Sequence, residues 1–272
     1  MLNGLAQLGL EEDDLATLRE LISVPYGMIL VTGPIGSGKT TTLYSILNEM
    51  NILTANIVTI EDPVEYSLPG INQVQVAPKV GLTFAAGLRS ILRQDANILM
   101  VGEIRDAETA AISVRAANTG HLLLSTLHTN DAVGAVTALH HLDVKPFLIG
   151  SGLVGVAAQR LVRKLCPQCR EAYIPEAGER EALGLVPRSR RRVYRSLGCE
   201  ACAGAGYRGR TGVFEVFRVS DRAREAIVGG KRAPTIRRIA EEEGMRSLVD
   251  NGRRKVLAGI TSYEELVRVI NM

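Results

Sequence analysis

The chain of 272 residues contains no tryptophan, and aromatic residues make up only 4% of it. Its apolar content of 46% therefore comes mainly from Ala, Leu, Val and Ile, which suits helices packed on a sheet. A chain of this length can bury a sizeable core, as one large domain or two small ones.

Long apolar runs and a strong charge are also missing. No run of 18 apolar residues occurs, and the nearest, Phe147–Ala158, is short and interrupted by three glycines. The net charge of +3 is too small to indicate a nucleic-acid or membrane partner by itself. The first residues lack the basic patch and apolar core of a secretory signal. We therefore expect a soluble, cytoplasmic protein.

Apolar strands alternate with helical segments over the first half of the chain. We expect strands at Gly27–Gly33, Ala55–Asp62, Ile98–Gly102 and His121–Thr126. We expect helices at Glu11–Ile22, Thr40–Met50, Phe84–Arg93, Asp106–Asn118 and from Asp131 onward. Because this alternation is typical of βαβ units, the sequence predicts an α/β fold with a mostly parallel sheet.

The composition changes after about Arg163. Cysteine pairs, arginine runs and loops rich in Pro and Gly come first, and a helical tail follows. The helices expected in the tail lie at Asp221–Val228, Ala233–Glu243, Ser247–Ala258 and Ser262–Asn271.

The clearest motif is "GPIGSGKT", which runs from Gly33 to Thr40 between a predicted strand and a predicted helix. This pattern is typical of a phosphate-binding loop, in which backbone N–H groups and the helix N-terminus surround a phosphate. Lys39 is expected to reach the β- and γ-phosphates, and the Thr40 hydroxyl to bind Mg²⁺. The predicted nucleotide-binding residues are Gly33, Pro34, Ile35, Gly36, Ser37, Gly38, Lys39, Thr40 and Thr41.

Polar side chains stand where three of the predicted strands end. Glu103 suits a general base or water-positioning residue, Glu61 a Mg²⁺ ligand, and His128 a hydrogen-bonding partner of the γ-phosphate. Many ATP-hydrolysing motors have Asp directly before the glutamate at the end of such a strand, but Gly102 stands there in this sequence. Each acid could instead be an exposed strand end or a helix cap, and Asp62, which precedes a proline, could simply shape a turn.

All four cysteines fall in two pairs, "CPQC" and "CEAC", separated by 29 residues. Four thiolates complete a tetrahedral Zn²⁺ shell with no open position, so Cys166, Cys169, Cys199 and Cys202 predict a structural zinc site. The alternative is a set of reduced thiols without metal.

Four stretches identify a resemblance to a family. "GPIGSGKTTTLY", "TIEDPVEY" with "INQVQV", "LRSILRQDANILMVGEIRDAETA" and "TGHLLLSTLHTNDA" resemble, in order and spacing, the motor ATPases of type II secretion and type IV pilus assembly. They correspond to that family's Walker A loop, Asp box, Walker B strand and His box. A glycine at position 102 is normal there. The resemblance runs from about Leu8 to the C-terminus.

The resemblance implies a RecA-like domain that assembles into a homo-hexamer. Its ATP hydrolysis would move an inner-membrane platform protein that assembles pilins or pseudopilins, and the motor would associate peripherally with the inner membrane. The family's catalytic arginines correspond to Arg89, Arg93 and Arg105. Four-residue spacing places the first two on one face of the predicted helix. For Arg105 the alternative is a salt bridge with a nearby acid.

The resemblance also predicts the division of the chain. We expect a RecA-like motor domain at 1–162, a zinc-binding subdomain at 163–210 and a helical subdomain at 211–272. The family's additional N-terminal domain is expected to be absent, which predicts weak hydrolysis by this chain alone. The paired cysteines resemble those of assembly and secretion motors, whereas retraction motors generally lack them.

Five arginines lie between the cysteine pairs, at positions 188, 190, 191, 192 and 195. The stretch Cys166–Cys202 carries seven arginines against five glutamates, so a solvated loop is the simplest interpretation. Docking to a platform protein or to anionic lipid headgroups is the alternative.

Two other functions fit the phosphate-binding loop. A ring ATPase that transports nucleic acid would share the motor core, but the near-neutral charge disfavours it. A P-loop kinase for a small substrate would leave the His box and the cysteine pairs without a role.

Overall fold

The computed structural model describes residues 4–50 and 55–270, which form two compact units. The first contains the described residues of Met1–Gln159 together with Glu215–Met245. The second contains Arg160–Phe214 and the described residues of Arg246–Met272. Each unit therefore joins stretches that lie far apart in the sequence.

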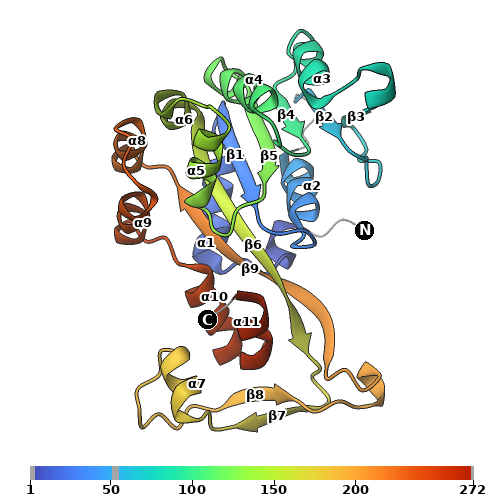
Figure 1. The fold of residues 1–272 in the computed structure, drawn as a ribbon. Helices are drawn as coiled ribbons and strands as arrows, with labels where there is room; N and C mark the ends of the chain where they lie inside the picture. The colour runs from blue at the N-terminus through green and yellow to red at the C-terminus, as the bar shows by residue number, and fades with distance from the viewer. Residues whose placement is uncertain (1–3, 51–54, 271–272) are drawn as a thin grey trace. The chain divides into compact units, whose positions relative to one another are not determined.

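The first unit is built on a parallel sheet (Figure 1). Within the described residues, seven strands are hydrogen-bonded in the order β3-β2-β4-β5-β1-β6-β9. Every neighbouring pair from β3 to β6 is parallel, which confirms the predicted α/β fold. The bounds are β1 Gly27–Thr32, β2 Ile57–Glu61, β3 Asn72–Gln75, β4 Ile98–Val101, β5 Leu122–Leu127, β6 Leu153–Leu165 and β9 Tyr207–Arg218. The part of β6 after Gln159 and the part of β9 before Glu215 belong to the second unit.

Local sequence signals place the helices of this unit. The first helix, α1, begins with three acidic residues that complement its dipole, and it buries Leu18 and Leu21. The Thr83 hydroxyl caps α3 and the Asp106 carboxylate caps α4. The helices are α1 Glu12–Ile22, α2 Lys39–Met50, α3 Phe84–Ile91, α4 Ala107–Asn118, α5 Gly134–His141, α6 Pro146–Gly152, α8 Asp221–Val228 and α9 Ala233–Glu242, with the 3₁₀ turns η1 Leu5–Gln7 and η2 Pro78–Val80.

Four central strands, β1, β2, β4 and β5, are buried along their whole length. Because they run parallel, their carboxyl ends meet at one edge of the sheet, where ligands bind in open α/β folds. This brings the loop after β1, Glu61, the residues after β4 and His128 to the same edge.

The second unit contains an antiparallel hairpin and two C-terminal helices. In the hairpin, β7 Arg170–Tyr173 pairs with β8 Val193–Ser196. Leu183, Val193, Val256 and Leu266 form its apolar cluster. The remaining elements are α7 Ala177–Ala182, the turn η3 Glu200–Cys202, α10 Leu248–Leu257 and α11 Tyr263–Ile270. The predicted last helix ended at Asn271, which lies outside the described residues.

Two long strands were not predicted. β6 follows α6 directly, so its apolar residues continue the glycine-interrupted run Phe147–Ala158 and give no separate strand signal. β9 contains Gly209, which has a φ of +76°, and its first half is rich in Arg and Gly, as loops often are. None of the helices in the described part of the chain combines the length and the apolar character needed to cross a bilayer.

Candidate active site and metal centre

The loop between β1 and α2 requires its first glycine. Gly33 has a φ of +150°, and a Cβ there would lie 2.5 Å from the Gln159 carbonyl oxygen and 2.6 Å from Ser37 Oγ. Gly36 and Gly38 also have positive φ, at +77° and +89°. The "GPIGSGKT" sequence therefore forms a tight curl that only glycine allows at these points.

Lys39 lies over this curl. Its Nζ donates hydrogen bonds to the carbonyl oxygens of Gly33 at 2.9 Å and Pro34 at 3.1 Å. Behind the loop, the buried Thr42 hydroxyl donates to the Gln159 side chain at 2.6 Å, which ties α2 to β6. The ammonium group is thus held at the position where a phosphate-binding loop needs a cation.

A cavity of about 370 Å³ opens beside the loop at the carboxyl ends of the strands. It is lined by residues from all four predicted motifs, namely Ile35, Gly36, Lys39, Thr40, Leu43, Glu61, Asp62, Pro63, Glu65, Phe84, Met100, Gly102, Glu103, Arg105, Thr126 and His128. The structure therefore brings the predicted Glu61, Glu103, Arg105 and His128 together with Lys39 and Thr40.

Glu103 lies between a cation and a histidine. Its side chain is 12% exposed, Oε1 is 2.5 Å from Arg105 Nη2, and Oε2 is 3.5 Å from His128 Nε2. The salt bridge that the sequence left as the alternative for Arg105 is therefore present, and its partner is Glu103. Thr126 fixes the backbone here, because its hydroxyl donates to the Gly102 carbonyl oxygen at 2.8 Å.

Glu61 has a different environment. It is 2% exposed, and its carboxylate accepts hydrogen bonds from the hydroxyls of Tyr44 and Thr59 and from the amide of Gln73. Burial, followed by the hydrogen bond to Glu61, raises the pKa of Tyr44 well above its usual range. Sequence reasoning assigned no role to Tyr44 and Gln73, although both lie within the stretches "GPIGSGKTTTLY" and "INQVQV" that carry the family resemblance.

Gly102 is not required by the backbone. A Cβ there would lie 3.4 Å from the Ile60 carbonyl oxygen and 3.5 Å from Glu61 Cα, which are ordinary contacts. Space for a small side chain therefore exists where other motors carry Asp.

Arg89 and Arg93 do not line the cavity. Arg89 forms a salt bridge with Glu108 at 2.5 Å. The prediction that both arginines share one helix face is wrong, because α3 ends at Ile91 and Arg93 lies in the turn that follows.

The four cysteines of the second unit come together. Their sulfur atoms all lie within 4.8 Å of one another, with pairs at 3.9 Å, 3.8 Å and 3.7 Å. Zn–S bonds of about 2.3 Å in a tetrahedron place the sulfurs roughly 3.8 Å apart. The cluster therefore fits a metal ion of this size.

The backbone also prepares one thiol for a metal. The N–H groups of Cys199 and Gly206 donate to Cys202 Sγ at 3.2 Å each, and these hydrogen bonds lower the pKa of Cys202 to about 6. Burial raises the pKa of Cys169 to about 11. A cation is the natural means of ionising all four thiols.

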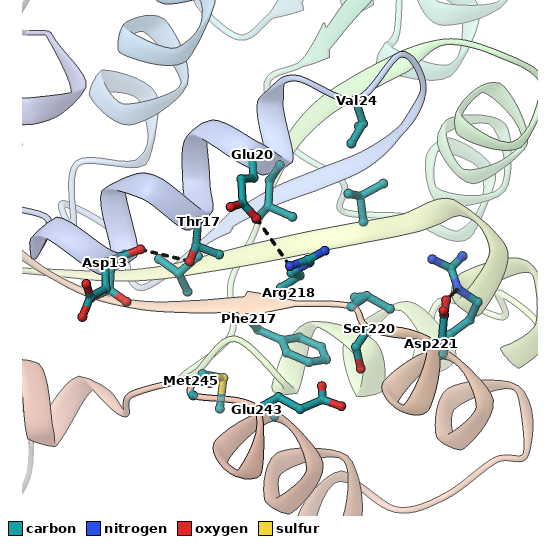
Figure 2. Close-up of a pocket in the computed structure, with 18 residues that line it drawn as sticks. Asp13, Thr17, Glu20, Val24, Phe217, Arg218, Ser220, Asp221, Glu243 and Met245 are labelled. Atoms are coloured by element: carbon teal, nitrogen blue, oxygen red, sulfur yellow. Dashed lines mark hydrogen bonds and ion pairs between the residues drawn. The ribbon is translucent and has the colours of Figure 1, made fainter.

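A larger hollow of about 610 Å³ lies elsewhere in the first unit, between α1, β9 and the ends of α8 and α9 (Figure 2). Glu20 pairs with Arg218 at its rim, 3.4 Å apart, and Phe217 forms part of its apolar floor. It contains none of the predicted site residues.

A glycine-rich loop between a parallel strand and a helix, facing acids at neighbouring strand ends, defines a P-loop nucleotide-binding protein. A model of the family described as Type II/IV secretion system protein matches residues 1–268. The chain belongs to this family, which confirms the resemblance found in its four motifs.

Individual relatives support the same family assignment. The chain is 51% identical over 265 residues to type II secretion system protein E of Pseudomonas aeruginosa, covering 97% of this chain and 53% of that protein. It is 51% identical over 251 residues to the type IV pilus assembly ATPase PilB of Thermus thermophilus, covering 92% and 28%. The chain thus spans about half the length, or less, of these relatives.

The fold also matches a solved structure, the pilus retraction motor PilT with bound ADP. The TM-score is 0.74 at 26% identity, over 98% of this chain and 67% of that one. The α/β fold with its mostly parallel sheet is thus one already seen in a motor protein.

Proposed function

We propose that this chain is the motor portion of an ATPase whose hydrolysis of ATP powers pilin assembly in type IV pilus biogenesis or pseudopilin assembly in type II secretion. The observation that carries the proposal is the cavity where the Gly33–Thr40 loop faces Glu103, Arg105 and His128. The names of the two relatives, a type II secretion protein and a pilus assembly ATPase, support it.

In this proposal the loop residues Gly33–Thr41 enclose the phosphates of ATP, and Lys39 exchanges its carbonyl partners for phosphate oxygens. Glu103 accepts the proton of the attacking water as a general base. Arg105 and His128 flank that carboxylate and stabilise the negative charge that develops on the γ-phosphate.

Mg²⁺ would neutralise phosphate charge at this site. Thr40 fits as a ligand because it is exposed and lines the cavity. Glu61 also lines the cavity, but its oxygens already accept hydrogen bonds, so we assign it to the outer shell of the ion, through water. Glu61 then supplies the carboxylate that Gly102 lacks.

Arg89 and Arg93 are assigned to the assembled ring. Since neither lines the cavity of its own chain, each would approach the ATP of a neighbouring subunit in a homo-hexamer. The Arg89–Glu108 salt bridge is exposed, and opening such a pair costs little.

The remaining assignments are also proposals. The four cysteines bind structural Zn²⁺, and the predicted boundaries at 162 and 210 separate the motor, zinc-binding and helical parts. The partners are an inner-membrane platform protein and other components of the machine. The cytoplasmic motor associates peripherally with that membrane, and the exposed Arg188 and Arg192 are candidates for contact with anionic lipid.

Nucleotide binding and hydrolysis test the proposal directly. Lys39→Ala should weaken binding of a fluorescent ATP analogue by at least about tenfold, because the phosphates lose their cation. An unchanged affinity would contradict the assignment of the loop. Stimulation of hydrolysis by polynucleotide would favour the nucleic-acid motor instead.

A further inference from the structure

A buried carboxylate lies behind the loop that carries His128. Glu215 in β9 is 2% exposed, and its Oε1 accepts the backbone N–H of Ala132 at 2.8 Å. A buried carboxylate is costly unless it is paired and hydrogen-bonded. Arg237 of α9 is a charged partner, with its Nη1 3.6 Å from Oε2.

Arg237 reaches the same loop with its other nitrogen. Its Nη2 lies 2.7 Å from Asp131 Oδ1, and that oxygen also accepts the N–H of Gly134 at 2.7 Å, where α5 begins. The Thr129 hydroxyl donates to the Asp131 carbonyl oxygen at 2.8 Å. The turn after β5 is thus fixed by groups from β9 and α9.

This turn directly follows His128 and fixes the backbone next to it. Asp131 follows His128 by three residues, and His128 Nε2 lies 3.5 Å from Glu103 Oε2. His128 itself is 44% exposed, so its position depends on the backbone more than on packing. A change in the Thr129–Ala132 backbone therefore alters the direction in which the imidazole points.

We propose that Arg237 and Glu215 are positioning residues for the active site, which hold the Thr129–Ala132 turn so that His128 faces Glu103. The proposal rests on the proposed function for its effect on ATP hydrolysis. Neither residue lines the cavity, so in this proposal both act through the turn. Through Arg237, α9 contacts the turn that follows the candidate catalytic His128, although α9 contributes no residue to the cavity.

A double-mutant cycle with His128 tests this coupling. Arg237→Ala should lower kcat about tenfold with less than about twofold change in KM for ATP, since a small misplacement of a reacting group lowers the rate steeply. In a His128→Ala background the same change should lower kcat less than about twofold, because nothing remains to position. Equal losses in the two backgrounds would overturn the proposal.

Two milder variants test the same contacts in case Arg237→Ala fails to fold. Asp131→Asn keeps an oxygen for the Gly134 N–H but removes one of the two charged partners of Arg237, and it should show the same pattern more weakly. Arg237→Lys keeps the charge and should recover part of the activity. The matched control is Arg238→Ala, on the next residue of α9, whose exposed side chain pairs with Glu242. It should leave kcat unchanged.

A measurement that does not depend on ATP hydrolysis distinguishes failure of this proposal from failure of the proposed function. The chain has four histidines, so the ring signal of His128 can be assigned in an NMR spectrum. Arg237→Ala should shift that signal and Arg238→Ala should not. If no variant or wild type hydrolyses ATP, a selective shift still supports the positioning role while the proposed function fails. An unmoved signal in Arg237→Ala overturns the positioning role.

Discussion

At the candidate active site, two glutamates lie at neighbouring strand ends in different surroundings. Glu103 is in contact with Arg105 and His128, close to open space, whereas Glu61 is enclosed by hydroxyl and amide donors. A carboxylate that accepts a proton must reach the attacking water, and one saturated by fixed donors is suited to holding its shape. The two environments therefore suit the two proposed roles, the general base for Glu103 and the outer-shell acid for Glu61.

Substitutions at position 102 test whether glycine is needed before Glu103. Gly102→Ala should change the free energy of unfolding by less than about 1 kcal/mol and ATP hydrolysis less than about twofold, because its Cβ would meet only ordinary contacts. The matched change Gly33→Ala should abolish nucleotide binding, since its Cβ would clash at 2.5 Å. Nucleotide titration and urea unfolding measure both. A severe loss in Gly102→Ala would show that glycine is required there.

The boundaries of several strands and helices could be predicted, because the signals that set them lie in the adjacent sequence. A short apolar strand that ends in glycine and runs into "GSGKT" specifies both the strand and the helix that follows. The parallel sheet then brings Glu103 and His128 together without further information. Arg237 and Glu215 could not be found this way, because they are about 100 residues from the turn they hold and have no motif.

The long strands show a second reason why part of the fold could not be predicted from the sequence. β6 carries "LVGVAAQRLVRKL", which is apolar in its first half and basic in its second, and it belongs to both compact units. A strand whose surroundings change along its length has no single periodicity to detect. α3 ended two residues before the prediction for a similar reason, because helix ends depend on local turn geometry.

Within the second unit, α11 depends on one buried acid. Glu265 is 1% exposed and bonded to Arg163 and Arg268, both at 2.7 Å. Burial opposes its ionisation, but the hydrogen bonds from Arg268 and Arg163 outweigh burial and lower the pKa of Glu265 to about 2. Arg163 also lies over the ring of Tyr207, 4.1 Å from its centroid.

This arrangement predicts a pH dependence of stability. Because the folded-state pKa lies below the ordinary value of 4.5, the contribution of Glu265 is complete above about pH 4.5 and is lost as the pH falls toward 2. Glu265→Gln should lower the free energy of unfolding by about 2 kcal/mol at pH 7, and the difference from wild type should shrink at pH 3. Urea unfolding at both values checks this. Glu264→Gln, on an exposed neighbour, should show neither effect, and a difference independent of pH would contradict the assignment.

The cysteine cluster joins two turns separated by 29 residues of sequence. We expect one Zn²⁺ per chain by elemental analysis. Removing it with a chelator should lower the melting temperature by about 10 °C, because several kcal/mol of folding free energy come from the metal. Cys199→Ser should bind less zinc and melt lower before any chelator is added. A melting temperature unaffected by chelation would favour metal-free thiols.

The family relationship and the candidate site both support the proposed ATPase motor. The chain matches the family model over residues 1–268, and its cavity holds a cationic loop, a carboxylate and a histidine. In the proposed hexamer, Arg89 and Arg93 would complete the site of a neighbouring subunit. The oligomeric state must therefore be determined together with the activity.

The most direct test is steady-state ATP hydrolysis by the wild-type chain and by Glu103→Gln, with the mass of each measured by light scattering. The account predicts that Glu103→Gln binds ATP with unchanged affinity and hydrolyses it at least about a hundredfold more slowly, because the general base is lost. Activity near that of wild type would contradict the role of Glu103 and transfer the chemistry to Glu61.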